Sequence, residues 1–241
     1  MEVIIKSNYQ EMSLLAAKYL LDTVKGKSDA VIGLPTGSTP LEMYSAVVEE
    51  CRKNTISFQN VKTFNLDEYI GLGKTDENSY YYFMNTNLFS HIDIKKENIH
   101  IPDGMTGNVK QECTNYENKV RQAGSMDILF LGIGKNGHIG FNEPGDFFEP
   151  YTHEVKLQQN TINANSRFFE STHDVPTTAI TMGIKTILSA KKIVLLAEGE
   201  SKAEAVEKMV NGKITPRLPA SILQLHDNIT VIIDKKAAGN L

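Results

Sequence analysis

The chain has 241 residues, which is enough for one large α/β domain with a sizeable core. Its formal net charge is -4 and its Lys and Arg residues do not cluster, so a nucleic-acid partner is not expected. Cys51 and Cys113 are too few for a disulfide framework and lack metal-ligand spacing. The N-terminus lacks an apolar signal core and no run approaches the roughly 20 residues of a membrane span, which predicts a cytoplasmic protein without a membrane partner.

Short apolar runs alternate with amphipathic segments along the chain. The runs predict strands, and the segments, whose apolar residues recur at helical spacing, predict helices. This alternation is typical of an α/β fold in which a mostly parallel sheet has helices on both faces. No repeat or linker interrupts it, so we expect one domain over residues 1–241. The predicted strands are 3–5, 30–34, 61–66, 128–132, 193–197 and 229–233, and the predicted helices are 11–24, 41–52, 80–89, 109–123 and 203–210.

The first candidate site follows the predicted strand 30–34 and reads GLPTGSTP. Ser38 or Thr39 is placed to cap a helix whose first turn holds Pro40. The unpaired N–H groups and the positive dipole end of such a helix favour a bound phosphate. No Lys precedes the Ser/Thr pair, so the Walker A loop of an NTPase is not expected. The alternative is an ordinary turn between a strand and a helix.

The second candidate site is the sequence NLDEY, where the predicted strand 61–66 leaves the sheet. Asp67 and Glu68 are adjacent on extended chain, so their side chains point in opposite directions and at most one faces a shared pocket. An acidic pair that caps a helix or lies in solvent is the alternative.

The third candidate site is residues 131–144, which read LGIGKNGHIGFNEP at the end of a predicted buried strand. Its glycines allow sharp bends and a close approach to a ligand, while Asn136, His138 and Glu143 supply an amide, an imidazole and a carboxylate. The glycine spacing also matches the G-x-G-x-x-G of dinucleotide-binding folds. However, the chain continues with a further glycine and a proline instead of a helix, which argues against a nicotinamide site.

Two more stretches carry polar residues of interest. Residues 145–178 are the longest part without clear periodicity, which predicts an active-site lid or a subdomain. They include Arg167, for which a surface position or a structural ion pair is the alternative. After the predicted strand 193–197, Ser201 is placed to cap a helix and Lys202 falls in its first turn. A cation there opposes the helix dipole unless an anion lies in front of it.

Taken in order, the motifs GLPTGSTP, NLDEY, LGIGKNGHIGFNEP, NSRFF and GESKAEAV resemble those of the glucosamine-6-phosphate deaminases, over residues 33 to about 226. The resemblance implies a Rossmann-like fold of the sugar-phosphate isomerase type. It also implies the reaction, in which α-D-glucosamine 6-phosphate and water give fructose 6-phosphate and ammonia. No metal or organic cofactor is implied.

The resemblance also implies roles for individual residues. Asp67 corresponds to the base that moves a proton between C2 and C1, and His138 to the group that opens the sugar ring, with Asn136 and Glu143 as its supporting residues. Some members have Asp where this chain has Asn136, so we expect a different pH profile. The implied substrate- and phosphate-binding residues are Gly37, Ser38, Thr39, Asp67, Gly137, Arg167 and Lys202.

The long members of the family are hexamers that N-acetylglucosamine 6-phosphate activates through basic residues after the FNEP segment. Residues 151–156 are poorer in cations here, and the chain stops at Leu241, short of the tail of those members. We therefore expect an enzyme without that activation, with a monomer and a homo-oligomer both left open.

Two other functions compete with this one. 6-Phosphogluconolactonases share the fold and a similar glycine-rich stretch, but the sequence FNEP after His138 favours a deaminase, and Tyr69 stands where lactonases usually have Arg. A sugar-phosphate sensor that reuses the fold without catalysis is the other alternative. The presence of Asp67, His138 and Glu143 argues against a pure sensor.

Overall fold

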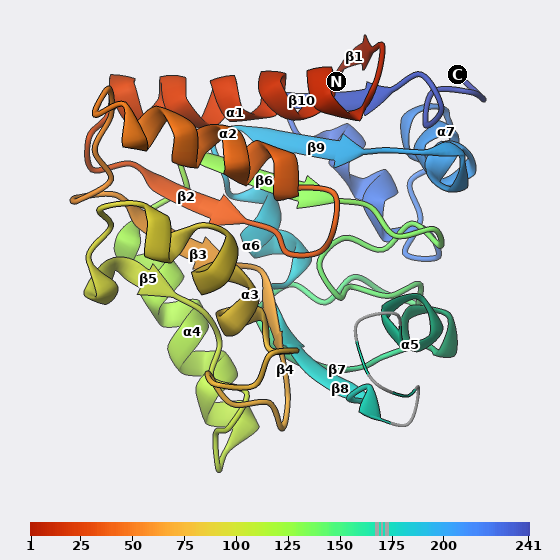
Figure 1. Ribbon diagram of the computed structural model, residues 1–241. Helices are drawn as coiled ribbons and strands as arrows, with labels where there is room; N and C mark the ends of the chain where they lie inside the picture. Colours follow the sequence, from red (N-terminus) through yellow and green to blue (C-terminus); the bar gives the residue numbers. More distant parts are fainter. Residues whose placement is uncertain (167–168, 170, 172–173) are drawn as a thin grey trace.

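A seven-stranded sheet forms the centre of the protein (Figure 1). The structure is a computed structural model, which describes residues 1–166, 169, 171 and 174–241. The strand order is β1-β10-β9-β6-β2-β3-β5, and every neighbouring pair is parallel. The predicted parallel sheet is therefore confirmed, although the two-residue strand β5 was too short to be predicted. The bounds are β1 (Glu2–Lys6), β2 (Val31–Leu34), β3 (Lys62–Asn65), β5 (Ile99–His100), β6 (Ile128–Gly132), β9 (Ile193–Ala197) and β10 (Ile229–Asp234).

Helices cover both faces of this sheet, as predicted. Alternate residues of a strand face opposite ways, so Ile128 and Phe130 pack toward one helical layer and Leu129 and Leu131 toward the other. Burial on both faces explains why the strands are continuous apolar runs. The first layer contains α1 (Tyr9–Gly26), α2 (Leu41–Arg52) and α3 (Tyr80–Asn87), and the second contains α4 (Val109–Ala123), α6 (Ile184–Leu188) and α7 (Ala203–Asn211).

A smaller antiparallel sheet lies beside the main one, in the order β4-β8-β7, with bounds β4 (Asp67–Tyr69), β8 (Thr178–Thr181) and β7 (His153–Lys156). Strand β7, the first residue of β8 and helix α5 (Gln159–Asn165) give regular structure to part of residues 145–178, for which the sequence shows no periodicity. Buried Glu117 on α4 anchors this region, because its carboxylate accepts hydrogen bonds from Thr152 N at 3.0 Å and Thr152 Oγ1 at 2.8 Å.

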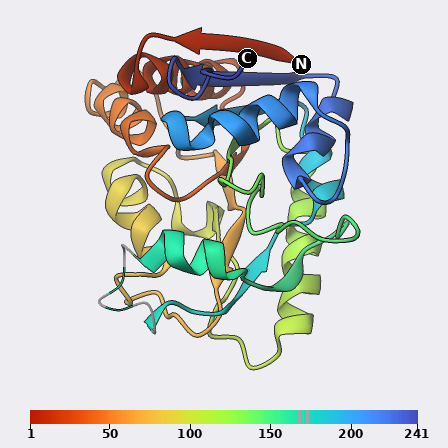
Figure 2. The same cartoon turned by 90° about the vertical axis from the view of Figure 1, so that its right-hand side faces the viewer.

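The strand order reverses direction between β2 and β6. From β2 the chain continues to β3 and β5, whereas from β6 it continues to β9 and β10 on the other side. Connections that diverge in this way leave a crevice at the carboxyl ends of the strands. In Figure 2 the green chain after β6 passes between α7 in blue and α5 in teal. Within the described part of the chain, no helix is long and apolar enough to cross a membrane.

Candidate active site

A cleft of about 810 Å³ lies at the carboxyl ends of β2, β6 and β9, next to β4. Its size is within the range of small-molecule sites. Glu143 and Gly137 do not line the cleft, and Arg167 lies outside the described residues. The predicted site residues that line it are Gly37, Ser38, Thr39, Asp67, Asn136, His138 and Lys202.

The turn between β2 and α2 forms one end of the cleft. Gly37 has a φ of 92°, which favours glycine, and a Cβ at this position would meet no atom within 4 Å. Pro40, and not Ser38 or Thr39, occupies the N-cap position of α2, and it provides no side-chain cap, so the prediction that Ser38 or Thr39 is the cap was wrong. The helix begins at Leu41, in agreement with the predicted range 41–52, but Pro40 precedes its first turn instead of lying within it.

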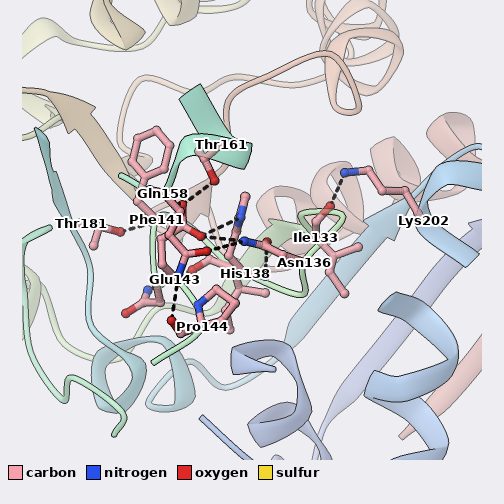
Figure 3. Close-up of polar contacts among 12 residues, drawn as sticks. Ile133, Asn136, His138, Phe141, Glu143, Pro144, Gln158, Thr161, Thr181 and Lys202 are labelled. Atoms are coloured by element: carbon pink, nitrogen blue, oxygen red, sulfur yellow. Dashed lines mark hydrogen bonds and ion pairs between the residues drawn. The ribbon is translucent and has the colours of Figure 1, made fainter. Parts of the chain in front are cut away.

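Lys202 approaches the same end of the cleft from β9. It occupies the N-cap position of α7, after a short 3-10 turn over Glu200–Lys202, so the predicted cap by Ser201 was also wrong. Its Nζ donates a hydrogen bond of 2.6 Å to the backbone oxygen of Ile133 (Figure 3). This bond holds a cation at the N-terminus of α7, in the same cleft that residues 37–39 before α2 line.

Asp67 is the first residue of β4, and its side chain lies in the cleft with only 5% of the residue exposed. Burial, and secondly the charge of Glu68, raise the pKa of Asp67 to about 8. No described residue donates a hydrogen bond to its carboxylate. Gly140 approaches it closely, since a Cβ there would lie 3.4 Å from Asp67 Oδ2. Because no described residue donates to it, this carboxylate is available to accept a proton from a ligand.

Glu68 points away from the cleft, as the extended chain predicts. Its carboxylate accepts hydrogen bonds of 2.9 Å from the backbone N–H groups of Tyr69, Tyr80 and Tyr81, so it caps the start of α3. Burial raises its pKa to about 7, although these N–H groups oppose the shift. The two adjacent carboxylates therefore have different tasks, one in the site and one in the fold.

Asn136, His138 and Glu143 come together on the loop after β6 (Figure 3). Nδ1 of His138 lies 3.5 Å from Oε2 of Glu143, and Asn136 Nδ2 donates a 2.8 Å hydrogen bond to the same oxygen. The imidazole also packs against the backbone of Gly134, where a Cβ would lie 2.3 Å from His138 Cε1. This glycine is required because the ring occupies the space of a side chain.

Glu143 is held from its other side by the segment that contains α5. Thr161 Oγ1 donates a hydrogen bond to Oε1 of Glu143, and the backbone N–H of Gln158 donates to the same oxygen at 3.4 Å (Figure 3). Burial alone raises the pKa of Glu143, but the contacts with His138, Thr161 and Asn136 outweigh it and hold the pKa below its usual value. Glu143 is thus an anion that supports the imidazole.

Gly137 serves the local fold of the loop that carries His138. Its φ is 84°, its carbonyl accepts from Ala220 N at 2.9 Å, and a Cβ would lie 2.3 Å from Leu218 Cδ1. The glycine therefore permits the tight turn that carries His138 and packs against the chain after α7. Its predicted contact with the substrate stays a prediction.

Sequence reasoning missed several residues of the site. Thr161 and Gln158 lie in a short polar helix and its N-cap, far along the chain from Glu143, and no motif marks them. Thr36 lies inside the motif GLPTGSTP, which could have suggested it. Other lining residues that were not predicted are Tyr80, Lys135, Asn160, Asn163, Asn165 and Glu198. Among the described residues, no three His, Cys, Asp or Glu side chains gather to hold a metal ion.

Residues 7–232 match the family described as glucosamine-6-phosphate isomerases/6-phosphogluconolactonase. Glucosamine-6-phosphate deaminases of Clostridium botulinum (strain Langeland) and Oceanobacillus iheyensis are each 53% identical over all of this chain, which covers 99% and 96% of their lengths.

Solved structures agree with these relatives. The structure of a monomeric glucosamine-6-phosphate deaminase matches with a TM-score of 0.98 and 48% identity, over 100% of both chains. A 6-phosphogluconolactonase from Trypanosoma cruzi, with a TM-score of 0.81 and 20% identity over 100% of this chain and 96% of its own, shares the fold alone. The chain belongs to the glucosamine-6-phosphate isomerase and 6-phosphogluconolactonase family, and within it to the glucosamine-6-phosphate deaminases.

Proposed function

We propose that this deaminase converts α-D-glucosamine 6-phosphate and water to fructose 6-phosphate and ammonia, with Asp67 as the base and His138 as the group that opens the ring. One observation carries this proposal. A buried carboxylate with a raised pKa and no hydrogen-bond donor among the described residues lines the same cleft as an imidazole supported by a carboxylate. Isomerisation of an amino sugar requires these two groups.

Ring opening comes first, because the closed sugar has no acidic C–H bond. A proton must leave the anomeric hydroxyl and another must reach the ring oxygen, a relay that suits an imidazole. Nδ1 of His138 faces Glu143, so Nε2 is the atom left to exchange protons with the sugar. Glu143 is ionised, because its pKa is lowered, and so it stabilises the imidazolium during the transfer.

Proton transfer between carbons follows in the open form. The C2 proton is acidic because it lies next to the C1 carbonyl. The Asp67 carboxylate removes it while the C1 oxygen takes a proton from the ammonium group of the substrate, which gives an enolamine. The same carboxyl returns the proton to C1, which leaves an imine at C2. Water adds to the imine and ammonia departs, so atoms and charges balance. The raised pKa of about 8 makes Asp67 a stronger base than an exposed carboxylate.

The other end of the cleft is suited to the phosphate. The backbone around Gly37, Ser38 and Thr39 lies at the N-terminus of α2, and Lys202 brings a cation to the N-terminus of α7. These contacts supply binding energy and orientation, and they lie away from the reacting carbons. The predicted contribution of Arg167 concerns a residue outside the described part of the chain.

We further propose that the single catalytic domain includes an active-site lid within residues 145–178. The support is that Asn160, Thr161 and Asn163 of α5 line the cleft, so that movement of this segment changes access to His138 and Glu143. The protein is proposed to act as a monomer in the cytoplasm, without activation by N-acetylglucosamine 6-phosphate. Light scattering would test the monomer, and sigmoidal rate curves abolished by that sugar would overturn the lack of activation.

The decisive experiment measures ammonia and fructose 6-phosphate from glucosamine 6-phosphate, for the wild type and Asp67→Asn. We expect equimolar products, and a loss of roughly 10³- to 10⁴-fold in kcat for the variant, which has no base. 6-Phosphogluconolactone serves as the control substrate. Rapid lactone hydrolysis without turnover of the amino sugar would contradict the proposal, and so would tight sugar-phosphate binding without turnover of either substrate.

A further inference from the structure

The loop of residues 35–39, between β2 and α2, is tied at both ends by tyrosine hydroxyls. Tyr44, which is fully buried on α2, donates a hydrogen bond of 2.5 Å to the carbonyl oxygen of Pro35. Tyr9, the first residue of α1, donates one of 3.0 Å to the carbonyl oxygen of Ser38. The tyrosines therefore reach the loop from two different helices.

A buried side chain also binds the last carbonyl group of β2, the strand before the loop. Nδ2 of Asn65, a fully buried residue at the end of β3, donates to the carbonyl oxygen of Leu34 at 3.1 Å. Because Tyr44 and Asn65 are inaccessible to solvent, the carbonyl oxygens that they bind face the protein interior. Side chains thus satisfy the carbonyl groups on both sides of the turn.

Three backbone N–H groups of the loop, unlike the carbonyl groups of Pro35 and Ser38, are left without hydrogen-bond partners among the described residues. Within the described part of the chain, the N–H groups of Thr36, Gly37 and Thr39 have no hydrogen-bond acceptor in the protein. All three residues line the cleft. The C=O of one residue and the N–H of the next belong to one peptide unit and point in opposite directions. Holding the carbonyls of Pro35 and Ser38 inward therefore directs the N–H groups of Thr36 and Thr39 toward the cleft, where an anion can accept from them.

Tyr9 has a second contact that concerns the helix. Its hydroxyl accepts a hydrogen bond of 3.3 Å from the backbone N–H of Glu42, in the first turn of α2. Pro40, the N-cap residue of α2, provides no side-chain cap. A hydroxyl from α1 therefore satisfies one of the helix amides and at the same time fixes the carbonyl of Ser38.

We propose that Tyr9 and Tyr44 are positioning residues for the substrate phosphate: their hydroxyls hold the carbonyls of Ser38 and Pro35 away from the cleft, so that the loop amides remain directed at the anion. The inference rests on the proposed function, which places the phosphate at this loop. It assigns the hydroxyls a role in affinity and none in the chemical step, because neither hydroxyl has to touch the substrate.

The test uses Tyr9→Phe and Tyr44→Phe in the full-length enzyme. We expect KM for glucosamine 6-phosphate and the inhibition constant for inorganic phosphate to rise together, each by up to about fivefold per lost hydroxyl, while kcat changes little. Tyr19→Phe is the matched control on α1, because its ring lies near Lys192 Nζ, away from the loop. Tyr116→Phe is the control for a lost buried hydroxyl, since Tyr116 donates to the carbonyl of Asn65 at 2.6 Å.

The variant Lys202→Met shows whether a negative result concerns the role of the tyrosines or the placement of the phosphate at this site. Weaker phosphate inhibition in Lys202→Met, with unchanged inhibition in both tyrosine variants, would overturn the role of the tyrosines and leave the site standing. Unchanged inhibition in all three variants would overturn the placement of the phosphate. A fall in kcat with a constant inhibition constant would also contradict the inference. If Tyr44→Phe does not fold, the less buried Tyr9 still provides the test.

Discussion

The two ends of the cleft offer different chemical groups: mainly backbone amides at one end and side chains at the other. At the proposed phosphate end, the loop after β2 offers mainly backbone amides, and Lys202 is the one described basic side chain assigned to the phosphate. At the proposed reacting end, the side chains of Asp67, His138 and Glu143 extend from β4 and from the loop after β6. Backbone amides remain when a side chain changes, whereas a proton transfer requires specific atoms at specific places. Substitutions should therefore reduce the activity more at the proposed reacting end than at the proposed phosphate end.

Among substitutions outside the proposed base and imidazole, the largest effect is expected from Gly134→Ala. The new Cβ would lie 2.3 Å from the His138 ring, so the imidazole has to move away from its present position. A displacement of about 1 Å can cost roughly 10²-fold in rate, and we expect a loss of kcat of that order. Steady-state kinetics would measure it, with Gly145→Ala as the control because its Cβ meets only ordinary contacts, the nearest at 3.7 Å. Equal activity of the two variants would contradict the proposed constraint.

The second prediction concerns pH, through the raised pKa of Asp67. The carboxyl must be ionised to act as a base, so kcat/KM should increase as the pH rises toward about 8. Stability should change in the opposite direction. The folded protein keeps this proton between the ordinary pKa near 4 and about 8 while the unfolded chain loses it, so the stability that Asp67 contributes is lost as the pH rises through that window.

Asp67→Asn removes this titration and gives the matched comparison. We expect its Tm to exceed that of the wild type by a margin that grows as the pH rises from about 4 to about 8 and then levels off. Thermal denaturation at a series of pH values would measure the margin. A constant difference between the two proteins across this range would mean that the carboxyl is not strongly perturbed.

A smaller effect is expected from Thr161→Val. The variant loses the hydrogen bond to Oε1 of Glu143, so the pKa of that carboxyl rises and its hold on His138 weakens. We expect kcat to fall by about tenfold, consistent with the loss of one hydrogen bond to a charged group, with less change in KM. Asn163→Ala, at another position of α5 that lines the cleft, is the comparison. Similar losses in both variants would point to a general disturbance of the helix.

The smallest effect is expected from Thr39→Ala at the other end. Its side chain does not cap α2, and its proposed contribution is the backbone N–H, which alanine retains. KM should therefore change by no more than about threefold and kcat hardly at all, a change comparable to a weak exposed interaction. Kinetics on glucosamine 6-phosphate would decide. A loss similar to that of Thr161→Val would remove the distinction between the two ends.

The long helices and all strands of the main sheet except β5 could be predicted because they depend on local patterns, whereas the short helix α6 was missed. Strands buried on both faces appear as apolar runs, and the bounds of α2 and α4 follow from helical spacing and flanking turn residues. The small sheet could not be predicted in this way. Strand β7 has partly exposed residues and no apolar run, and it is stabilised by pairing with β8 and by the contact of Thr152 with Glu117. Such contacts between distant segments leave no periodic signal.

The sequence by itself determined the fold class, the family and the loops that form the cleft, because glycine spacing and polar residues after apolar strands are local features. The tertiary structure decided which neighbours set the chemistry. It placed the side chain of Asp67 in the cleft and that of Glu68 outside it, and it brought Thr161 into hydrogen-bonding contact with Glu143. It also provided the hydroxyl of Tyr9 as an acceptor for a backbone N–H at the start of α2, where a cap by Ser38 or Thr39 was expected. The physical reason is that pKa values and hydrogen-bond partners depend on burial and on atoms brought together from remote parts of the chain, which no local pattern records.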